Sequence, residues 1–484
     1  MRALKDPSLM ETRAYVNGIW VEAKKTFPVE NPATGDVIAH VADLSAEDVA
    51  MAIDAAYVAQ RAWARADVKT RSNTLRKLFD LMVENADDLA TILTLEMGKP
   101  WAEARGEILY GASYIEWFAE EAKRIYGDMI PGPQNDKRMV IVKQAVGVVG
   151  AITPWNFPNA MIARKMAPAL AVGCSMVARP SEFTPLSALA LAVLAERAGI
   201  PAGVFNVLPG LDAAGMGQEL CANPKVAKIT FTGSTRVGKI LLSQGAETVK
   251  KMSMELGGNA PFIVFDDADV EAAVEGAMLA KFRNNGQTCV CANRIYVQAG
   301  IYDEFSEKLA TALGSLKLGD GFAEGVNTGP LINAAAVAKV EDHIKDAVEK
   351  GAEVVVGGNR SNLGQTFFEP TVLKGVTQKM KVATEETFGP LAPLVKFDTE
   401  DEAVEFANAT EFGLASYFFT NDLKRAWRVG EALETGMVGI NTGAISTEMA
   451  PFGGVKQSGM GREGSKYGCD DYLEIKNLCF GGLT

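Results

Sequence analysis

The chain has 484 residues, of which 48% are hydrophobic and 22% are charged, a profile typical of a globular protein rather than a disordered one. At roughly 100–200 residues per domain, this length predicts about two to four domains. Sixty acidic and 48 basic side chains leave a net charge of −12. Phosphate attraction requires clustered lysine and arginine, so we expect no nucleic-acid partner and no membrane partner.

The sequence predicts a soluble, cytoplasmic protein. The N-terminal residues lack an apolar segment followed by a small-residue cleavage site, so no secretory signal is expected. The most apolar stretch, residues 183–195, is shorter than the ~20 residues that cross a bilayer. Six scattered cysteines suit a reducing compartment better than a disulfide framework.

Only two histidines are present, His40 and His343, and we expect both at the surface. No pair of CxxC motifs compensates for them, so no metal site is predicted. Residues 266–269 contain three aspartates but precede an amphipathic segment, and helix capping explains them better than metal binding. Any nucleophilic catalysis by this chain would therefore need a carboxylate as its base.

Residues 1–125 are expected to begin with a short β region and to continue as helices. Ser45 and Asp48 form a capping-box pattern before an apolar helical face. Apolar residues between 75 and 82 recur at helical spacing, and a later helix is predicted to end at residues 98–100, Gly-Lys-Pro. Residues 139–146 follow a Pro-Gly-Pro turn and are predicted to form an extended arm.

Strands and helices alternate from residue 146 to residue 256, which predicts a parallel sheet with helices on its faces. The predicted strands are 146–152, 175–178, 203–207, 228–231 and 251–254, and the predicted helices include 163–170, 186–198 and 236–244. A second α/β unit begins near residues 261–265 and runs to about residue 456. The alternating tail segment 472–476 could pair with another chain.

Two short motifs carry candidate chemistry. Gly233, Ser234 and Gly238 lie in a turn between a strand and a helix, where backbone N–H groups can bind phosphate, although such turns are often only structural. Cys289 follows a Gly-Gln-Thr turn. A thiol with an ordinary pKa near 8.5 needs an activator to act as a nucleophile, and Glu255 at a predicted strand end is the candidate base. A single cysteine such as Cys289 is more often a buried filler than a nucleophile, and the alternative for Glu255 is a structural or surface carboxylate.

Seven motifs in order change this interpretation. They are Thr-Pro-Trp-Asn-Phe-Pro (153–158), Arg-Pro-Ser-Glu (179–182), the 231–238 turn, Glu-Leu-Gly-Gly-Asn (255–259), Gly-Gln-Thr-Cys (286–289), Glu-Glu-Thr-Phe-Gly-Pro (385–390) and Pro-Phe-Gly-Gly (451–454). Together they resemble the aldehyde dehydrogenase superfamily over essentially the whole chain. Residues 281–293 and 461–467 most resemble its succinate-semialdehyde dehydrogenase branch.

The resemblance implies an α/β aldehyde dehydrogenase fold with a Rossmann-like NAD-binding domain, an α/β catalytic domain and a small β oligomerisation element. We assign residues 1–125 and 146–256 to the first, 257–456 to the second, and 126–145 with 457–484 to the third. It also implies a homodimer or homotetramer.

The resemblance also implies roles for the site residues. Cys289 attacks the aldehyde, Asn156 and the Cys289 backbone N–H stabilise the oxyanion, and Glu255 activates the hydrolytic water. Lys165 matches a proton-relay lysine, with Glu463 as a second carboxylate behind it. The expected cofactor-binding residues are Thr153, Pro154, Trp155, Arg179, Ser181, Glu182, Gly233, Ser234, Gly238, Leu256, Glu386 and Phe388.

NAD is the expected cofactor, with NADP as the alternative. Glu182 matches a family glutamate that accepts from the ribose 2′-hydroxyl, and its charge repels a 2′-phosphate. Arg179 stands where the family usually has lysine, and its guanidinium could instead bind that phosphate.

The resemblance implies a substrate with a distal carboxylate, held by Arg164, Arg283 and Ser446 beside Phe452. The alternative is that these arginines pair with protein carboxylates. Succinate semialdehyde is the expected substrate, while glutarate semialdehyde and bulkier or aromatic acid-aldehydes remain alternatives because one methylene changes binding by only about 1–3 kcal/mol. Glu255 disfavours a CoA-acylating enzyme, and the retention of Cys289 and Asn156 disfavours a binding protein built on an inactive dehydrogenase.

Cys291 could form a reversible disulfide with Cys289, as in some relatives of this branch. An inert pocket thiol is the equal alternative.

Overall fold

Two large sheets organise the chain in the computed structural model, which describes residues 2–364 and 366–483. The first sheet has eight strands, in the order β2 (Ile19–Val21), β1 (Ala14–Val16), β9 (Phe205–Val207), β8 (Ser175–Arg179), β7 (Val148–Ile152), β10 (Val226–Thr232), β11 (Lys251–Glu255) and β21 (Gly459–Met460). Its five central strands, β9 to β11 in that order, are parallel. The five strands predicted between residues 146 and 256 are therefore confirmed, and they are neighbours in one sheet.

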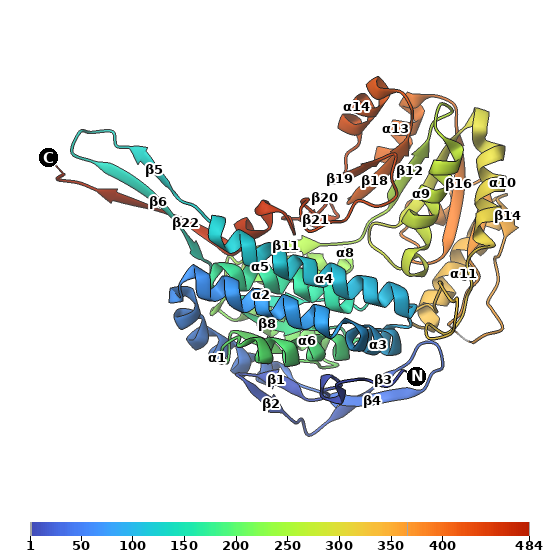
Figure 1. Cartoon of the computed structure of the whole chain (residues 1–484). Helices are drawn as coiled ribbons and strands as arrows, with labels where there is room; N and C mark the ends of the chain where they lie inside the picture. Colours follow the sequence, from blue (N-terminus) through green and yellow to red (C-terminus); the bar gives the residue numbers. More distant parts are fainter. Residues whose placement is uncertain (1, 365, 484) are drawn as a thin grey trace.

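Helices cover the first sheet on both sides, as Figure 1 shows. The predicted helices correspond to α5 (Pro158–Val172), α6 (Pro185–Ala198) and α8 (Thr235–Ala246). A further helix, α7 (Ala213–Ala222), was not identified from the sequence. Gly215 and Gly217 lower its helix propensity, whereas the Asp212 side chain caps it by accepting from the Gly215 N–H.

The N-terminal region begins with β1, β2 and a hairpin of β3 (Thr26–Glu30) and β4 (Val37–Ala42), and continues as helices α1 (Ala46–Arg65), α2 (Val68–Glu84), α3 (Ala86–Met97) and α4 (Trp101–Glu121). The Ser45–Asp48 capping box at the start of α1 is confirmed. Helix α3 ends at Gly98, in the left-handed conformation, as predicted. Helix α4 packs against both α2 and α5, and its Glu107 accepts from N–H groups at the start of α5, just after the loop that follows β7.

The second sheet has the strand order β14 (Glu353–Val356), β15 (Thr371–Lys374), β16 (Leu391–Phe397), β13 (Ala292–Gln298), β12 (Ala260–Val264), β18 (Ala415–Phe419) and β19 (Met437–Ile440). Alternate residues of central β12 enter two different cores: Phe262 packs with α9 (Val270–Phe282) and α10 (Tyr302–Leu313), and Ile263 with α11 (Ala334–Glu349), α13 (Glu400–Asn408) and α14 (Leu423–Ala432). Helices therefore cover both faces of this sheet too. We call each large sheet with its covering helices a lobe. The second lobe also contains the short elements α12 (Lys381–Thr384), β17 (Phe412–Gly413) and β20 (Val455–Lys456).

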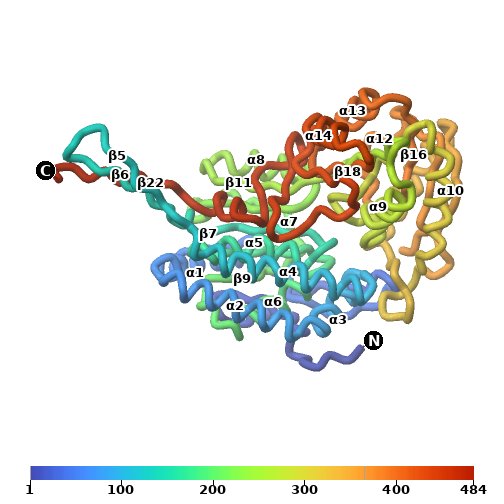
Figure 2. Tube along the Cα trace, turned by 45° about the horizontal axis from the view of Figure 1, so that its top comes forward, coloured from blue at the N-terminus to red at the C-terminus, as the bar shows by residue number. Residues whose placement is uncertain are grey.

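An arm of three antiparallel strands projects from the first lobe, as Figures 1 and 2 show. It contains β5 (Asp128–Pro131), β6 (Arg138–Ala145) and β22 (Leu473–Phe480). The predicted extended arm is thus confirmed. Residues 473–476 of the tail segment, which could pair with another chain, lie in β22. This strand pairs on one side with β6 of its own chain, from Leu473 opposite Ala145 to Phe480 opposite Arg138, and is an edge strand of the arm.

The two histidines differ in position. His40 is exposed on β4, as expected. The surface prediction for His343 is wrong: its side chain is fully buried, with Nδ1 3.1 Å from Thr387 Oγ1. His343 lies three residues after Val340, on the face of α11 that packs into the core. Burial lowers its pKa, and nearby Lys339 adds to this effect.

The aspartates at 266–269 act as structural groups. Asp269 caps α9 by accepting from the Ala272 N–H, and Asp267 pairs with Arg425 at 2.7 Å. Within residues 2–364 and 366–483, no group of three or more His, Cys, Asp or Glu side chains could hold a metal ion. Over the same residues, every helix is too short or too polar to cross a membrane.

Candidate active site

A cavity of about 400 Å³ brings together residues from both lobes. Loops that follow β7, β10 and β11 form one wall, at the carboxyl ends of three neighbouring parallel strands, which is where α/β sheets usually bind ligands. The start of α11 and residues 386–388 form the other wall. Asn156, Cys289 and Glu386, predicted from separate motifs, all line this one cavity.

Cys289 follows a tight turn, the 3-10 helix η3 (Arg283–Gly286). Gly286 has a φ of +75°, and a Cβ at this position would lie 2.2 Å from the carbonyl oxygen of Gly389. Only glycine therefore allows the turn to approach the loop that carries Glu386. Burial raises the pKa of the Cys289 thiol to about 12, and the carboxylates of Glu255 and Glu386 oppose the lowering effect of Arg164. The thiol is therefore uncharged at neutral pH and needs a proton acceptor to react.

Asn156 lies across the cavity wall from the nucleophile's turn. Its side-chain Nδ2 donates to the carbonyl of Gln287 at 3.0 Å. Its own carbonyl accepts from Asn284 Nδ2 at 3.1 Å and from Lys99 Nζ at 3.0 Å. Asn156 is thus tied to the Cys289 turn through both its side chain and its backbone.

Glu255 is the last residue of β11 and is buried. Among the described residues, no group donates a hydrogen bond to its Oε2. Burial raises the pKa of Glu255 well above its ordinary value, and Glu463 reinforces this, while Arg164 and Lys165 partly offset it. A buried carboxyl group without a full set of partners is a candidate proton acceptor.

Glu463 joins two cations from α5. Its Oε1 lies 2.5 Å from Lys165 Nζ, and its Oε2 lies 2.6 Å from Arg164 Nη2 as an ion pair without hydrogen-bond alignment. Burial opposes ionisation of Glu463, but the two cations more than offset it and lower its pKa. The Arg164 guanidinium also lies 3.9 Å from the ring centre of Phe452. Arg164 therefore pairs with a protein carboxylate, which was the alternative to a role in substrate binding.

Arg283 and Ser446 line a second, smaller cavity of about 50 Å³. Thr288 and Val290, the two neighbours of Cys289, line it as well. The Arg283 guanidinium lies 4.9 Å from the ring centre of Phe157. A cation and a hydroxyl thus line the same small cavity, which Cys289 itself does not line.

Helix α8 begins on the wall of the larger cavity. Gly233 and Ser234 line that wall, and Ser234 Oγ caps the helix by accepting from the Val237 N–H at 3.3 Å. Gly238 lies in the first turn, against the side chain of Leu256. The N-terminus of α8 therefore presents backbone N–H groups to the cavity, which suits a phosphate.

The far side of the cavity carries Glu386 and Phe388. Glu386 Oε1 accepts from the Gly258 N–H at 3.0 Å, and burial raises the pKa of Glu386 to about 7. The Phe388 ring lies 5.6 Å from the Trp155 ring in an edge-to-face arrangement. Pro154 also lines this cavity, and the Thr153 N–H donates to the carbonyl of Arg179.

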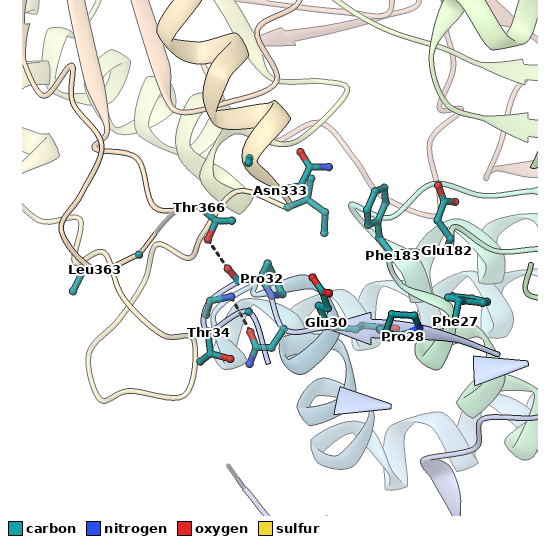
Figure 3. A pocket seen from close by; sticks show the side chains of 18 of the residues that line it. Phe27, Pro28, Glu30, Pro32, Thr34, Glu182, Phe183, Asn333, Leu363 and Thr366 are labelled. Atoms are coloured by element: carbon teal, nitrogen blue, oxygen red, sulfur yellow. Dashed lines mark hydrogen bonds between the residues drawn. The ribbon is translucent and has the colours of Figure 1, made fainter. Parts of the chain in front are cut away.

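Glu182 lies on the wall of an adjoining cavity of about 880 Å³, shown in Figure 3. Ile332 and Asn333 line both this cavity and the one that contains Cys289. Arg179 Nη2 lies 3.0 Å from Glu182 Oε2 and donates to the carbonyl of Gly210 at 2.8 Å. The two charges that bear on cofactor choice therefore pair with each other.

Ser181, the residue that precedes Glu182, is buried. Its Oγ accepts from the Phe183 N–H at 3.3 Å and lies 3.5 Å from Glu182 Oε2. Ser181 thus supports the turn that presents Glu182.

Cys291 is buried behind the nucleophile. Its Sγ lies 3.3 Å from Lys281 Nζ, which also donates to Asn293 Oδ1 at 3.1 Å. Burial raises the pKa of the Cys291 thiol, and Lys281 partly offsets this.

Sequence reasoning missed three buried groups around the site: Lys99, Glu107 and His343. Lys99 lies in the Gly-Lys-Pro segment that was interpreted only as a helix end. His343 contacts Thr387, between Glu386 and Phe388, yet its charged neighbours along the helix indicated a surface position.

Residues 20–478 match the model of the aldehyde dehydrogenase family. The chain is 62% identical to a 3-sulfolactaldehyde dehydrogenase of Pseudomonas putida, over all of both chains. It is 61% identical to a glutarate-semialdehyde dehydrogenase of Pseudomonas aeruginosa, over 99% of this chain and 100% of that protein. It is 59% identical to a succinate-semialdehyde dehydrogenase [NADP(+)] of Escherichia coli, over 99% of both.

A solved structure of a succinate-semialdehyde dehydrogenase from Burkholderia pseudomallei superposes with a TM-score of 0.98. It is 59% identical, over 99% of this chain and 100% of that one. The predicted fold is therefore confirmed. Sequence and structure agree over nearly the full length, and the chain belongs to the aldehyde dehydrogenase family.

Proposed function

We propose that this chain oxidises aldehydes that carry a distal anionic group, with succinate semialdehyde as the preferred substrate, to the corresponding acid with NAD(P)+ and water. The observation that carries the proposal is the cavity shared by Arg283 and Ser446, because two residues that line it, Thr288 and Val290, flank Cys289. In this proposal, an aldehyde whose carbonyl lies at Cys289 extends its anionic end toward the Arg283 guanidinium. Charge-assisted hydrogen bonds of this kind contribute roughly 1.5–3 kcal/mol each.

In the first step, Cys289 Sγ forms a bond to the aldehyde carbon while its proton passes to Glu255. The raised pKa of the thiol makes this acceptor necessary. The aldehyde oxygen becomes an oxyanion, which accepts from Asn156 Nδ2 and from the Cys289 N–H. Each such donor is worth roughly 3–4 kcal/mol in other enzymes.

Bound NAD(P)+ supplies the hydride acceptor. The acyl group then remains on Cys289 as a thioester. After releasing its first proton, Glu255 takes a proton from a water molecule while the water oxygen bonds to the acyl carbon. The Cys289 sulfur then leaves as a thiolate and regains its proton from Glu255. Lys165 and Glu463, joined at 2.5 Å, offer the proton a path away from Glu255.

The cavity that contains Cys289 and the adjoining cavity that contains Glu182 together form a groove that suits a dinucleotide. The N-terminus of α8 suits the phosphates, Glu386 the ribose, and the Trp155–Phe388 pair the ring at the Cys289 end. Two buried polar atoms near the groove, Thr232 Oγ1 and Arg179 Nε, have no hydrogen-bond partner among the described residues, which further supports a polar ligand. We propose NAD over NADP, because Glu182 already pairs with Arg179 and so leaves that guanidinium unavailable to a 2′-phosphate.

Names of the relatives support the substrate class. One acts on a sulfonate-bearing aldehyde and the others on semialdehydes that end in a carboxylate. A shared anionic end agrees with the Arg283 cavity. Glutarate semialdehyde, one methylene longer, is the second candidate.

The proposal is tested by initial rates with succinate semialdehyde, glutarate semialdehyde, 3-sulfolactaldehyde and butanal, each with NAD and with NADP. We expect kcat/KM to be at least about 100-fold higher for succinate semialdehyde than for butanal, the product of two charge-assisted contacts. Comparable rates on butanal would overturn the anion site. A higher kcat/KM for one of the other two anionic substrates would replace succinate semialdehyde within the same class.

We further propose a homo-oligomer assembled through the arm, and a cytoplasmic location. Strand β22 is an edge strand, and Ile475 and Phe480 on it are 71% and 49% exposed. We also propose a division into three parts. The cofactor domain comprises residues 1–125 and 146–256, the catalytic domain residues 257–456, and the third part the arm with the tail. Light scattering of the full chain and of an Ile475→Asp variant tests the oligomer, and an unchanged mass in the variant would place the interface elsewhere.

A further inference from the structure

A buried ion pair lies directly behind Asn156. Lys99 Nζ is 2.5 Å from Glu107 Oε2, and neither side chain has more than 1% of its surface exposed. Lys99 Nζ also donates to the carbonyl of Asn156 at 3.0 Å and lies 3.7 Å from the ring centre of Phe157. Lys99 therefore contacts both residues of the Asn-Phe dipeptide.

Glu107 extends the same contact to helix α5. Its second oxygen, Oε1, accepts from the backbone N–H groups of Asn159 at 3.0 Å and Ala160 at 3.2 Å. These are among the first N–H groups of α5, which have no partner within the helix. One carboxylate thus holds the start of α5 and the lysine that holds Asn156.

A second donor binds the same carbonyl oxygen. Asn284 Nδ2, in the turn before Cys289, donates to the Asn156 carbonyl at 3.1 Å, and Glu103 on α4 accepts from the Asn284 N–H at 2.7 Å. With two donors on one carbonyl oxygen, the backbone at Asn156 is held in place. The side-chain amide, whose Nδ2 donates to the Gln287 carbonyl at 3.0 Å, starts from this fixed backbone.

The chain holds Lys99 in place through its neighbours. Gly98 has a φ of +81°, and a Cβ there would lie 2.5 Å from Pro330 Cγ. Pro100 follows and precedes α4, so the three-residue connection between α3 and α4 has little freedom. A buried ion pair is costly in free energy because both charges leave water, so its presence calls for a specific role.

We propose that Lys99 and Glu107 are positioning residues that hold the Asn156 amide in the orientation that stabilises the oxyanion. The inference rests on the proposed function, in which Asn156 Nδ2 is an oxyanion donor. Neither Lys99 nor Glu107 lines the cavity that contains Cys289, so both act through Asn156.

A double-mutant cycle tests the proposal. Lys99→Met removes the ammonium, and Glu107→Gln removes the charge while its amide oxygen can still cap α5. Each is made in the wild-type chain and in the Asn156→Ala chain. Lys250→Met is the matched control, because Lys250 is also buried and also donates to main-chain carbonyls, those of Asn223 and Val226.

In the wild-type background, we expect Lys99→Met to lower kcat by about 10- to 100-fold, less than the 10²–10³ lost when an oxyanion donor itself is removed. The dissociation constant of NAD should stay within about twofold, since neither Lys99 nor Glu107 lines the two cavities proposed for the cofactor. In the Asn156→Ala background, the same substitution should lower kcat by less than about twofold. Lys250→Met should leave kcat unchanged in both.

An equal loss in both backgrounds would overturn the proposal, because the pair would then act independently of Asn156. If Lys99→Met does not fold, two milder variants replace it in the same cycle with the same criterion. Glu107→Gln retains the cap of α5, and Lys99→Arg retains the charge. Full activity of Asn156→Ala alone would instead refute the proposed oxyanion role. By contrast, if Asn156→Ala is slow and Lys99→Met still lowers its kcat by the full factor, the oxyanion role stands. Only the positioning role of Lys99 is then refuted.

Discussion

Arg164 Nη2 lies 2.6 Å from Glu463 Oε2, and both side chains are buried. A guanidinium that the sequence suggested for the substrate is thus already neutralised by a protein carboxylate. Arg283, by contrast, forms no salt bridge within the described residues and lines a cavity beside Cys289. The two arginines are therefore not equivalent, and their substitution should have different consequences.

Replacement of Arg283 by alanine should remove the preference for anionic aldehydes. We expect kcat/KM for succinate semialdehyde to fall by about 10- to 150-fold, the value of one charge-assisted contact, while kcat/KM for butanal changes little. Arg164→Ala should lower kcat for both substrates, because it leaves Glu463 with only Lys165 as a partner. Steady-state kinetics with the two substrates checks both predictions. An equal fall in kcat/KM for butanal in Arg283→Ala would contradict the proposed anion site at Arg283.

Glu255→Gln should retain the shape of the side chain and remove the proton acceptor. We expect kcat to fall by about 10²–10⁴, the usual contribution of a general base, with the dissociation constant of NAD unchanged. Quenched-flow measurement of the first turnover locates the affected step. Hydroxylamine, a stronger nucleophile than water, should restore part of the turnover where hydrolysis of the thioester is slow, and retention of full kcat would exclude Glu255 as the base.

The rate should rise with pH. Burial raises the pKa of Glu255 well above 4.5, and the charge of Glu463 adds to it. Below that raised pKa the carboxyl is protonated and cannot accept a proton, and above it the active carboxylate forms. Glu463→Gln removes the repulsive charge and frees Arg164, so it should move this limb of the pH–kcat profile to lower pH. The limb should disappear in Glu255→Gln, and its persistence there would assign it to another group.

Glu182→Ser should raise activity with NADP. At present Arg179 pairs with Glu182 at 3.0 Å, and the substitution frees the guanidinium for a 2′-phosphate. We expect the NADP-to-NAD ratio of kcat/KM to rise by at least about tenfold, one charge-assisted contact. The Arg179→Met/Glu182→Ser double variant should lose this gain, and a cofactor ratio that Glu182→Ser leaves unchanged would show that the pair does not govern the choice.

Peroxide should inactivate the enzyme reversibly through Cys291. Two thiols and one peroxide give one disulfide and two water molecules, and dithiothreitol reverses the reaction. With Cys291→Ala, Cys289 has no neighbouring thiol, so further oxidation is irreversible and dithiothreitol should no longer restore activity. Cys479→Ala, which removes an exposed cysteine on the arm, is the control and should keep the rescue.

Much of the fold followed from the sequence alone. Strands β7 to β11 are short apolar runs bounded by turns, and the period of α2 is helical, so local patterns were sufficient to place them. Cys289, Glu255 and Asn156 were found because their motifs occur in a recognisable order. Even α7, which was missed, has a capping aspartate, and only its two glycines concealed it.

Partner choice, however, is a property of the tertiary structure. The sequence placed Arg164, Lys165 and Glu463 near the site, but only packing of the C-terminal segment against α5 decided that Glu463 would neutralise both cations. Likewise, charged neighbours along α11 suggested an exposed His343, whereas the core beneath the helix buries it against Thr387. Local patterns determine which elements form. The burial and pairing of charges depend on residues far apart in the chain, such as Lys99 and Asn156, that meet only once α4 packs against α5.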